Sequence, residues 1–189
     1  MKLIKLRALL LVFCLAMAAQ QASAGILLRV FYDGNLVEGG LPGTSVDDLR
    51  AASFFPAGPN PDGFALFTDI WTDDVAAERG VNMGDNYGSY VRGYIQAPMD
   101  GDYVLYIASD DASELWLSSD TDPANIALVA AETGCCTALF GGARLAERST
   151  DIITLSRGQW IYFEILHKEG GGGDWIEVGW QRPDGVQEI

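Results

Sequence analysis

Cysteine and histidine are scarce in this chain of 189 residues, which holds three cysteines and one histidine. A zinc site needs several Cys or His ligands at characteristic spacings, so the composition argues against such a centre. Two of the cysteines, Cys135 and Cys136, are adjacent and cannot link distant strands. In an oxidising compartment they form either a vicinal disulfide that stiffens a loop or two small, half-buried residues.

Motifs for catalysis are missing as well. The sequence has no G-x-S-x-G, no H-E-x-x-H and no phosphate-binding loop. A single histidine and scattered serines do not make a catalytic triad. Paired carboxylates can serve a glycosidase, but among 26 acidic residues some pair is always present, so that signal has no specificity. We therefore expect that the chain is not an enzyme.

Basic residues are few, with 12 Lys and Arg against 26 Asp and Glu, for a formal net charge of −14. A surface this acidic repels nucleic acid and anionic lipid. It suits cations, uncharged partners such as sugars, or solubility alone. The charge balance therefore excludes nucleic acid as an expected partner.

Long apolar runs are absent beyond the start of the chain, where residues 8–19 form a stretch of twelve. Three basic residues precede it: Lys2, Lys5 and Arg7. Small residues follow at 22–24. This three-part pattern is typical of a secretory signal, and the run is shorter than the ~20 residues of a membrane span.

The sequence therefore predicts a signal peptide over residues 1–24 and one domain over 25–189, with no membrane insertion after signal removal. The predicted location is secreted, meaning extracellular, periplasmic or at the cell surface. Removal of the signal takes away three of the 12 basic residues and leaves a formal net charge of about −17. A domain of this length can bury a substantial core.

Apolar and polar residues alternate with period two in several short segments, which is the pattern of half-buried strands. The predicted strands are residues 26–32, 90–96, 102–108, 113–118, 152–155, 159–167 and 175–180. Residues 45–52 predict a short helix with Ser45 as its N-cap, and residues 54–69 read as a loop. The expected fold class is all-β, an antiparallel sandwich or barrel with little helix.

Two adjacent aspartates, Asp110 and Asp111, lie between two predicted strands. Like charges at neighbouring positions repel, and a calcium ion, which prefers carboxylate and carbonyl oxygens, would relieve the repulsion. The alternative is an acidic turn whose side chains cap backbone N–H groups. The local pattern alone leaves both open.

A run of four glycines, residues 170–173, lies between Glu169 and Asp174. Glycine lets the backbone approach other groups closely, so these carboxylates could add oxygens to a shared ion, or the segment could be a flexible tip. A third acidic cluster, residues 120–125, lacks the spacing of a calcium-binding EF-hand and reads as a turn.

Tryptophan is frequent on the predicted strands. Trp116, Trp160 and Trp180 are expected in the core. Trp175 follows the glycine run and is the first choice for stacking on the apolar face of a sugar ring.

Three stretches in this order resemble the PA14 domain family. The first holds Trp71, residues 84–88 and residues 91–95. The second is residues 100–117, which read as Gly, Tyr, an apolar strand, Ser-Asp-Asp and a second apolar strand. The third covers residues 155–164, then His167, Lys168 and Glu169 with the glycine run, and residues 175–180. The likeness covers nearly all of the predicted mature chain, and it is greatest to PA14 domains of secreted and surface proteins of bacteria.

The resemblance implies a PA14-type β-sandwich that binds carbohydrate. In the yeast adhesin branch, two consecutive aspartates joined by a cis peptide hold a calcium ion that contacts sugar hydroxyls, and Asp110 and Asp111 match that pair. The loop that supplies further ligands lacks the adhesins' asparagine here, so Glu169 and Asp174 are substitutes by position. The predicted metal ligands are Asp110, Asp111 and Glu169.

The leading hypothesis is a calcium-assisted module that recognises a glycan or polysaccharide. Its predicted ligand-binding residues are Trp175, Glu169, Asp174 and His167. The alternative is a structural or protein-interaction domain of the cell surface or matrix, in which calcium only fixes a loop. If the chain is a fragment of a larger protein, other domains are further partners.

Overall fold

A computed structural model of the chain describes residues 23–24, 27–33, 41–53, 55, 63–67, 85–140, 147–148, 151–173 and 175–188. The strands are β1 (Ser23–Ala24), β2 (Leu27–Asp33), β3 (Gly63–Phe67), β4 (Tyr87–Gln96), β5 (Gly101–Asp110), β6 (Ala112–Ser118), β7 (Ile126–Glu132), β8 (Glu147–Arg148), β9 (Ile153–Leu155), β10 (Trp160–Glu169), β11 (Trp175–Gln181) and β12 (Gln187–Glu188). One α-helix, α1 (Val46–Ala51), and a 3₁₀ turn, η2 (Pro123–Asn125), complete the described elements.

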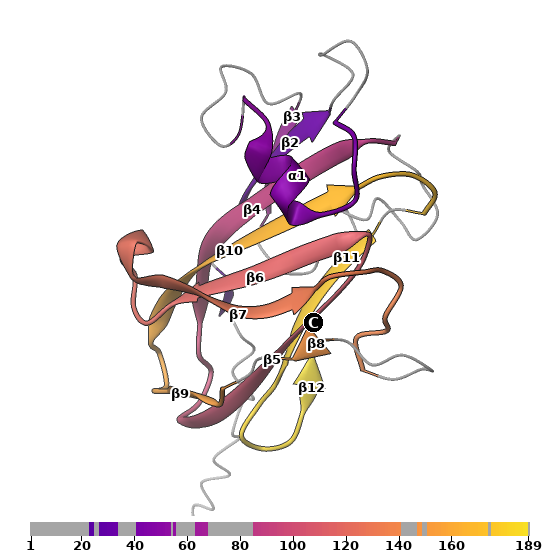
Figure 1. Ribbon diagram of the computed structural model, residues 1–189. Coiled ribbons are helices and arrows are strands. Elements are labelled where there is room, and N and C mark those ends of the chain that lie inside the picture. Colours follow the sequence, from indigo (N-terminus) through magenta and orange to yellow (C-terminus); the bar gives the residue numbers. More distant parts are fainter. Residues whose placement is uncertain are drawn as a thin grey trace, which may run out of the picture.

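The strands form two antiparallel sheets. The larger has the order β3-β2-β4-β10-β6-β7, with β1 also paired to β4, and the smaller has the order β12-β11-β5-β8, with β9 also paired to β5. In Figure 1, β4, β10, β6 and β7 run side by side, and β5, β11 and β12 make the second layer. The predicted antiparallel β-sandwich with little helix is confirmed.

The core lies between the sheets because alternate residues of each strand face inward. In β5, buried residues alternate with more exposed ones over residues 102–107. The core residues with 3% exposure or less are Val91, Ile95, Ala97, Tyr103, Leu105, Ile107, Leu115, Ile161, Phe163, Ile165 and Ile176. Burial of each large apolar side chain contributes about 1.5–3 kcal/mol, so this row is the main source of stability.

The short helix α1 begins where its sequence predicts. The Ser45 side chain accepts a hydrogen bond from the Asp48 N–H, and the Asp48 carboxylate accepts one from the Ser45 N–H, which makes a capping box. The Ser45 hydroxyl also donates to the Asp48 carboxylate, and this bond together with the one from the Ser45 N–H lowers the pKa of Asp48. Val46 and Leu49 are buried against the larger sheet.

Five of the described strands lie where the sequence predicted none: β1, β3, β7, β8 and β12. Residues 54–69 were expected to be a loop, but β3 lies within them, and β7 follows the acidic turn. Conversely, the predicted strands at 26–32, 90–96, 102–108, 113–118, 152–155, 159–167 and 175–180 each coincide with an observed strand within a few residues.

The proposed signal peptide falls mostly on residues 1–22, which lie outside the described part of the chain. Its last two residues form β1 and pair with Gln96 and Ile95 of β4. The signal peptide and its boundary stay predictions. Within the described ranges, no helix has the length and apolar character that a membrane span requires.

Candidate functional site

The two adjacent aspartates lie at the crossover between the sheets. Asp110 is the last residue of β5 in the smaller sheet, and β6 of the larger sheet begins at Ala112. The Asp110–Asp111 peptide bond is cis, as the resemblance implies, and both side chains are half-buried.

A third carboxylate joins this pair. Glu169 ends β10, whose preceding residue Lys168 pairs with Ala112, and its side chain is only 1% exposed. One carboxylate oxygen each from Asp110, Asp111 and Glu169 lies within 4.8 Å of the others. These are hard oxygen donors of the kind that calcium prefers, and three negative charges so close repel one another until a cation offsets them. The donor set therefore fits calcium.

The glycine run closes against these aspartates. The Gly170 N–H donates a 3.0 Å hydrogen bond to Asp111 Oδ2. A Cβ at Gly170 would lie 3.1 Å from that oxygen and 2.6 Å from Thr44 Cγ2, and a Cβ at Gly173 would lie 3.3 Å from Asp110 Oδ2. Glycine is therefore favoured at residue 170, because a side chain there would clash with Thr44 and crowd the Asp111 carboxylate. Asp174, the other predicted ligand, lies outside the described residues.

A buried lysine accompanies the three carboxylates. Lys168 is 0% exposed, and its Nζ donates to the backbone oxygens of Gly43, at 2.7 Å, and of Glu169. Burial lowers the pKa of Lys168, while attraction to Glu169, Asp48 and Asp111 opposes that change. Its position in the sequence gave no sign of this role, because a lysine near a loop is usually solvated.

Beneath the aspartates lies a row of buried polar side chains. His167 is 2% exposed, its Nε2 lies 2.8 Å from the Asp110 carbonyl, and its Nδ1 lies 3.3 Å from Ser89 Oγ. Because a carbonyl only accepts, Nε2 carries the proton. Ser109 Oγ donates to the Asp111 carbonyl and lies 2.7 Å from Ser113 Oγ.

His167 was predicted to bind the ligand, and the structure places it in the buried row beneath the aspartates; its contact with a ligand stays a prediction. Sequence reasoning missed the serines beside it, although a signal existed. Ser89, Ser113 and His167 occupy inward-facing strand positions, where apolar residues are the rule. Polar residues at such positions on adjacent strands indicate a shared buried network.

Trp175 begins β11 directly opposite Asp110. It is half-buried and packs against the cluster of Ala108 and Leu139. Of the other tryptophans expected in the core, Trp180 is 5% exposed and confirms the prediction. Trp116 is half-buried. Trp160 is 37% exposed, so that prediction was wrong, because Trp160 lies at the end of β10 on its outward face.

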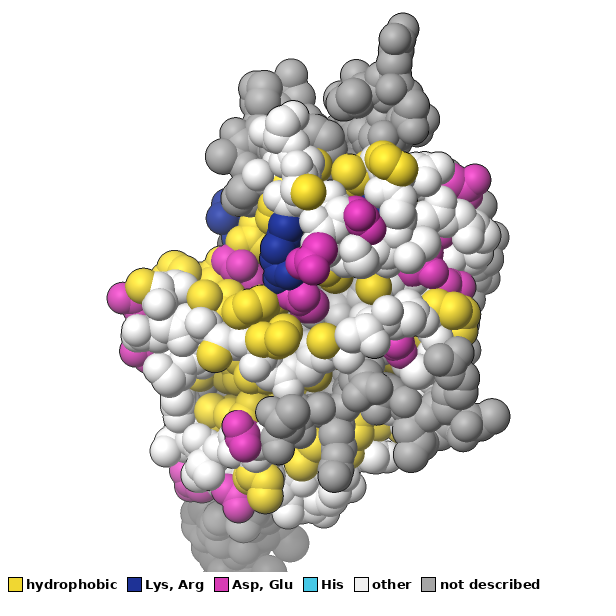
Figure 2. All heavy atoms as spheres, in the orientation of Figure 1, with side chains coloured by type: hydrophobic (Ala, Val, Ile, Leu, Met, Phe, Trp, Pro, Cys, Tyr) yellow, Lys and Arg dark blue, Asp and Glu magenta, His cyan; other side chains and the backbone are white. Residues whose placement is uncertain are grey.

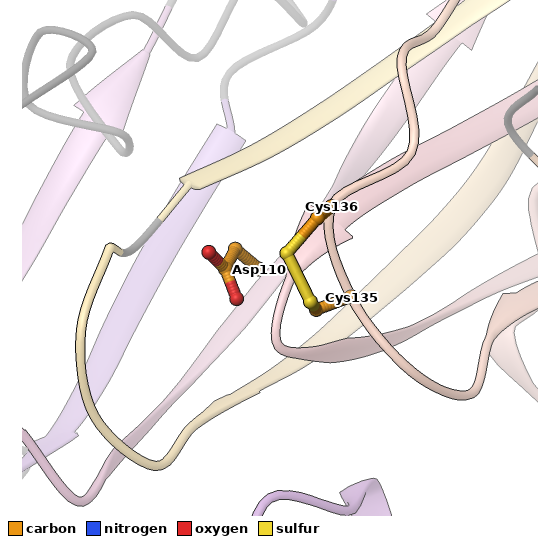
Figure 3. Close-up of side chains that lie close together, drawn as sticks. All are labelled: Asp110, Cys135 and Cys136. Atoms are coloured by element: carbon orange, nitrogen blue, oxygen red, sulfur yellow. A yellow bond between two sulfur atoms is a disulfide. The ribbon is translucent and has the colours of Figure 1, made fainter. Parts of the chain in front are cut away.

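Cys135 and Cys136 form a vicinal disulfide. Figure 3 shows the bond facing the Asp110 carboxylate, and each sulfur and one Asp110 oxygen lie within 4.8 Å of one another. The metal ligand form of cysteine is the thiolate. With the two sulfurs bonded to each other, this trio is no site for a soft metal.

The third acidic cluster is a turn, as predicted. Asp120 Oδ1 accepts hydrogen bonds from the Asp122 N–H and the Asn125 side chain, and Asp122 caps η2. Hydrogen bonds from the Asp122 backbone and the Asn125 side chain lower the pKa of Asp120. The carboxylates of Asp120 and Asp122 therefore accept hydrogen bonds from groups of their own turn.

No model of a known protein family matches the chain. One curated relative is similar: the chain is 40% identical over 100 residues to an N-acetyl-beta-glucosaminyl-glycoprotein 4-beta-N-acetylgalactosaminyltransferase 1 of Mus musculus. That match covers 51% of this chain and 10% of the mouse protein. The expectation that the chain is not an enzyme is contradicted by this match, because half of the chain resembles a segment of a glycosyltransferase. The chain spans about a tenth of that relative.

Solved structures share the architecture at low sequence identity. A PA14 sugar-binding domain from an RTX adhesin is 17% identical with a TM-score of 0.57, over 87% of this chain and 94% of that one. The epithelial adhesin 9 A domain of Candida glabrata, solved with Galβ1-4GlcNAc, is 13% identical with a TM-score of 0.53, over 87% and 84%.

An anti-sigma factor domain-containing protein from Clostridium clariflavum is 19% identical with a TM-score of 0.50, over 86% of this chain and 44% of that one. At such identities these similarities describe the fold. The chain has the antiparallel β-sandwich fold of PA14 domains.

Proposed function

We propose that this chain is a glycan-binding module whose site is completed by a calcium ion held by Asp110, Asp111 and Glu169. The observation that carries the proposal is the convergence of these three carboxylates within 4.8 Å. They come from the crossover between β5 and β6 and from the end of β10, segments far apart in the sequence. Acidic residues scattered by solubility alone have no reason to meet in this way.

The chemistry of calcium connects the site to sugars. Calcium takes six to eight oxygen ligands, so three side chains leave positions for water or for sugar hydroxyls. The formal charge of −14 disfavours polyanionic ligands. Figure 2 shows acidic side chains spread over the visible face with few basic ones among them. An uncharged glycan is the partner that this surface tolerates best.

Trp175 supplies the apolar part of the proposed contact. It lies across from Asp110, and an aromatic ring packs well on the C–H face of a sugar. Structures of the same fold support the class of ligand, since one is described as a sugar-binding domain and another was solved with Galβ1-4GlcNAc. Secretion, which the signal pattern predicts, belongs to the same proposal.

The test is calorimetric titration of the domain with Galβ1-4GlcNAc, in calcium and in a chelator. Binding that needs calcium supports the proposal, and Asp111→Asn should abolish it. Asp122→Asn is the matched control, because it removes the same charge from the η2 cap, where Asn also caps well. Binding of equal strength in calcium and chelator would show that the ion has no part in recognition.

The match to a glycosyltransferase favours a second candidate, recognition of an acceptor glycan for such an enzyme. In this case the module would hold a chain ending in N-acetyl-β-glucosamine, the group that the relative's name specifies as acceptor. The discriminating measurement is titration with a terminal N-acetyl-β-glucosaminide beside Galβ1-4GlcNAc, together with an assay for N-acetylgalactosamine transfer. A preference for the N-acetylglucosaminide supports acceptor recognition, and a preference for the terminal galactoside contradicts it.

A further inference from the structure

The segment after β7, residues 133–140, packs on the outer face of the smaller sheet. The Cys136 N–H donates a 2.7 Å hydrogen bond to the Ser109 carbonyl. Leu139 is 5% exposed and packs with Ala108, and the Phe140 ring meets Tyr106 edge-on at 5.3 Å. These contacts attach the segment to β5 at the disulfide and in the residues that follow it.

A glycine in the smaller sheet makes room for the segment in this position. A Cβ at Gly179 of β11 would lie 2.7 Å from the Phe140 ring and 2.9 Å from Leu139 Cδ2. Glycine at residue 179 therefore admits these two side chains onto the sheet. The packing of Leu139 and Phe140 on the smaller sheet therefore holds the disulfide beside Asp110.

The disulfide borders the proposed calcium site on one side. The Asp110 carboxylate is common to both groups, since its oxygens lie within 4.8 Å of Asp111 and Glu169 and within 4.8 Å of the two sulfurs. Calcium lies about 2.3–2.6 Å from its carboxylate ligands. A sugar whose hydroxyls bind such an ion on the Asp110 side would lie beside the sulfurs.

The chemistry of this border is apolar. A disulfide carries no charge and no hydrogen-bond donor, and its sulfurs are soft and polarizable. Cys136 is exposed and Cys135 half-buried, so solvent and a ligand can reach the pair beside the Asp110 carboxylate. Trp175, opposite Asp110 on β11, packs on the same Ala108–Leu139 cluster. Asp110 thus has an aromatic ring and a disulfide on the same face of the smaller sheet.

We infer that the bonded Cys135–Cys136 pair is a specificity-determining part of the binding site, where it contacts the C–H face of the sugar whose hydroxyls bind at Asp110. This inference rests on the proposed function. It assigns the pair a role in ligand selection beyond holding its own loop. The pair selects sugars that present an apolar face next to their metal-binding hydroxyls.

The test compares wild type with the double variant Cys135→Ser/Cys136→Ser, titrated with Galβ1-4GlcNAc in calcium. The expected result is a loss of affinity of about tenfold or more, with the rise in Tm on adding calcium unchanged. An unchanged calcium response shows that the carboxylate site is intact. Equal sugar affinity in the two proteins overturns the inference and leaves the proposed function standing.

A second measurement needs no variant and so does not depend on the double variant folding. In wild type labelled with ¹³C at cysteine, addition of Galβ1-4GlcNAc in calcium should shift the Cβ–Hβ resonances of Cys135 and Cys136. Binding that leaves both resonances in place contradicts the inference alone. A wild type that binds no glycan in calcium contradicts the proposed function and the inference with it.

Discussion

Gly170 packs against the aspartate pair more tightly than any other residue of the glycine run. An added methyl group would lie 2.6 Å from Thr44 and 3.1 Å from the Asp111 carboxylate. We predict that Gly170→Ala destabilises the domain by about 1–3 kcal/mol, the usual cost of overpacking, and weakens the response to calcium because Asp111 must move. Urea unfolding with and without calcium measures both effects.

Gly171 offers the matched control within the same run. Its added methyl group would lie 3.5 Å from the Asp85 carboxylate, an ordinary contact. Gly171→Ala should therefore retain the wild-type stability and calcium response. Equal behaviour of the two variants would show that the run does not position Asp111.

His167 holds the aspartate pair from inside the sandwich, through its 2.8 Å contact with the Asp110 carbonyl. His167→Leu removes the donor and leaves a buried carbonyl without it, at a cost of about 1–3 kcal/mol. We predict lower stability and a smaller calcium-induced rise in Tm. His167→Gln, which retains a side-chain N–H, should recover part of the calcium response, whereas loss of stability with a full calcium response would limit His167 to a packing role.

The sequence predicted which carboxylates come together better than it predicted the groups that surround them. Asp110, Asp111 and Glu169 meet in space. They could be named from the sequence because a cluster of hard oxygens needs acidic residues, which the sequence shows directly. The role of Lys168 depends on its contacts with Gly43 and Glu169 across the fold, and no local pattern encodes these. Ligand contact by His167, Glu169, Asp174 and Trp175 stays a prediction.

At the scale of the elements, tyrosines connect β4 to β10 on the outer face of the larger sheet. Tyr162 pairs with Tyr94, their rings meet edge-on at 5.3 Å, and the Tyr162 hydroxyl donates a 2.7 Å hydrogen bond to Glu164. Burial and the hydrogen bond to Glu164 raise the pKa of Tyr162 to about 12. Burial and Glu164 also raise the pKa of Tyr90 on β4.

A tyrosine whose pKa is raised by folding makes stability depend on pH in one direction. The stabilisation is fully present below the unfolded value of 10.0 and is lost as pH rises toward about 12. We predict that wild type loses stability over this alkaline range and that Tyr162→Phe loses less, because only the other tyrosines with raised pKa values, Tyr90 and Tyr103, then contribute. Chemical unfolding at several pH values measures the slopes, and identical slopes in both proteins would contradict the role of Tyr162.

Strands were predicted correctly where apolar and polar residues alternate regularly, and they were missed where a bulge or an alanine-rich sequence removes that alternation. The inward face of β5 carries Tyr103, Leu105 and Ile107, all 3% exposed or less, and burial along this stretch alternates with period two. The β7 segment is rich in alanine, and its pairing with β6 shifts register between Leu115 and Trp116. A bulge breaks the period, so β7 resembled no strand.

At the scale of the molecule, the proposed calcium site joins the two sheets. Asp110 belongs to β5 of the smaller sheet and Glu169 to β10 of the larger one. An ion bound to both would oppose their separation and would stabilise the native state as a whole. The fold class could be predicted from the sequence because strand spacing and turns determine it, whereas the meeting of Asp110 with Glu169 depends on how the sheets pack.

The most direct test of the calcium claim is thermal unfolding of the domain with excess calcium and with a chelator. Calcium at about 100 times its Kd adds about 2.7 kcal/mol, so the Tm of wild type should rise by roughly 5–10 °C. Asp110→Asn and Asp111→Asn should show no rise, and Asp122→Asn should behave as wild type. A wild type whose Tm is the same in calcium and chelator would contradict the account, since three converging carboxylates would then hold no ion.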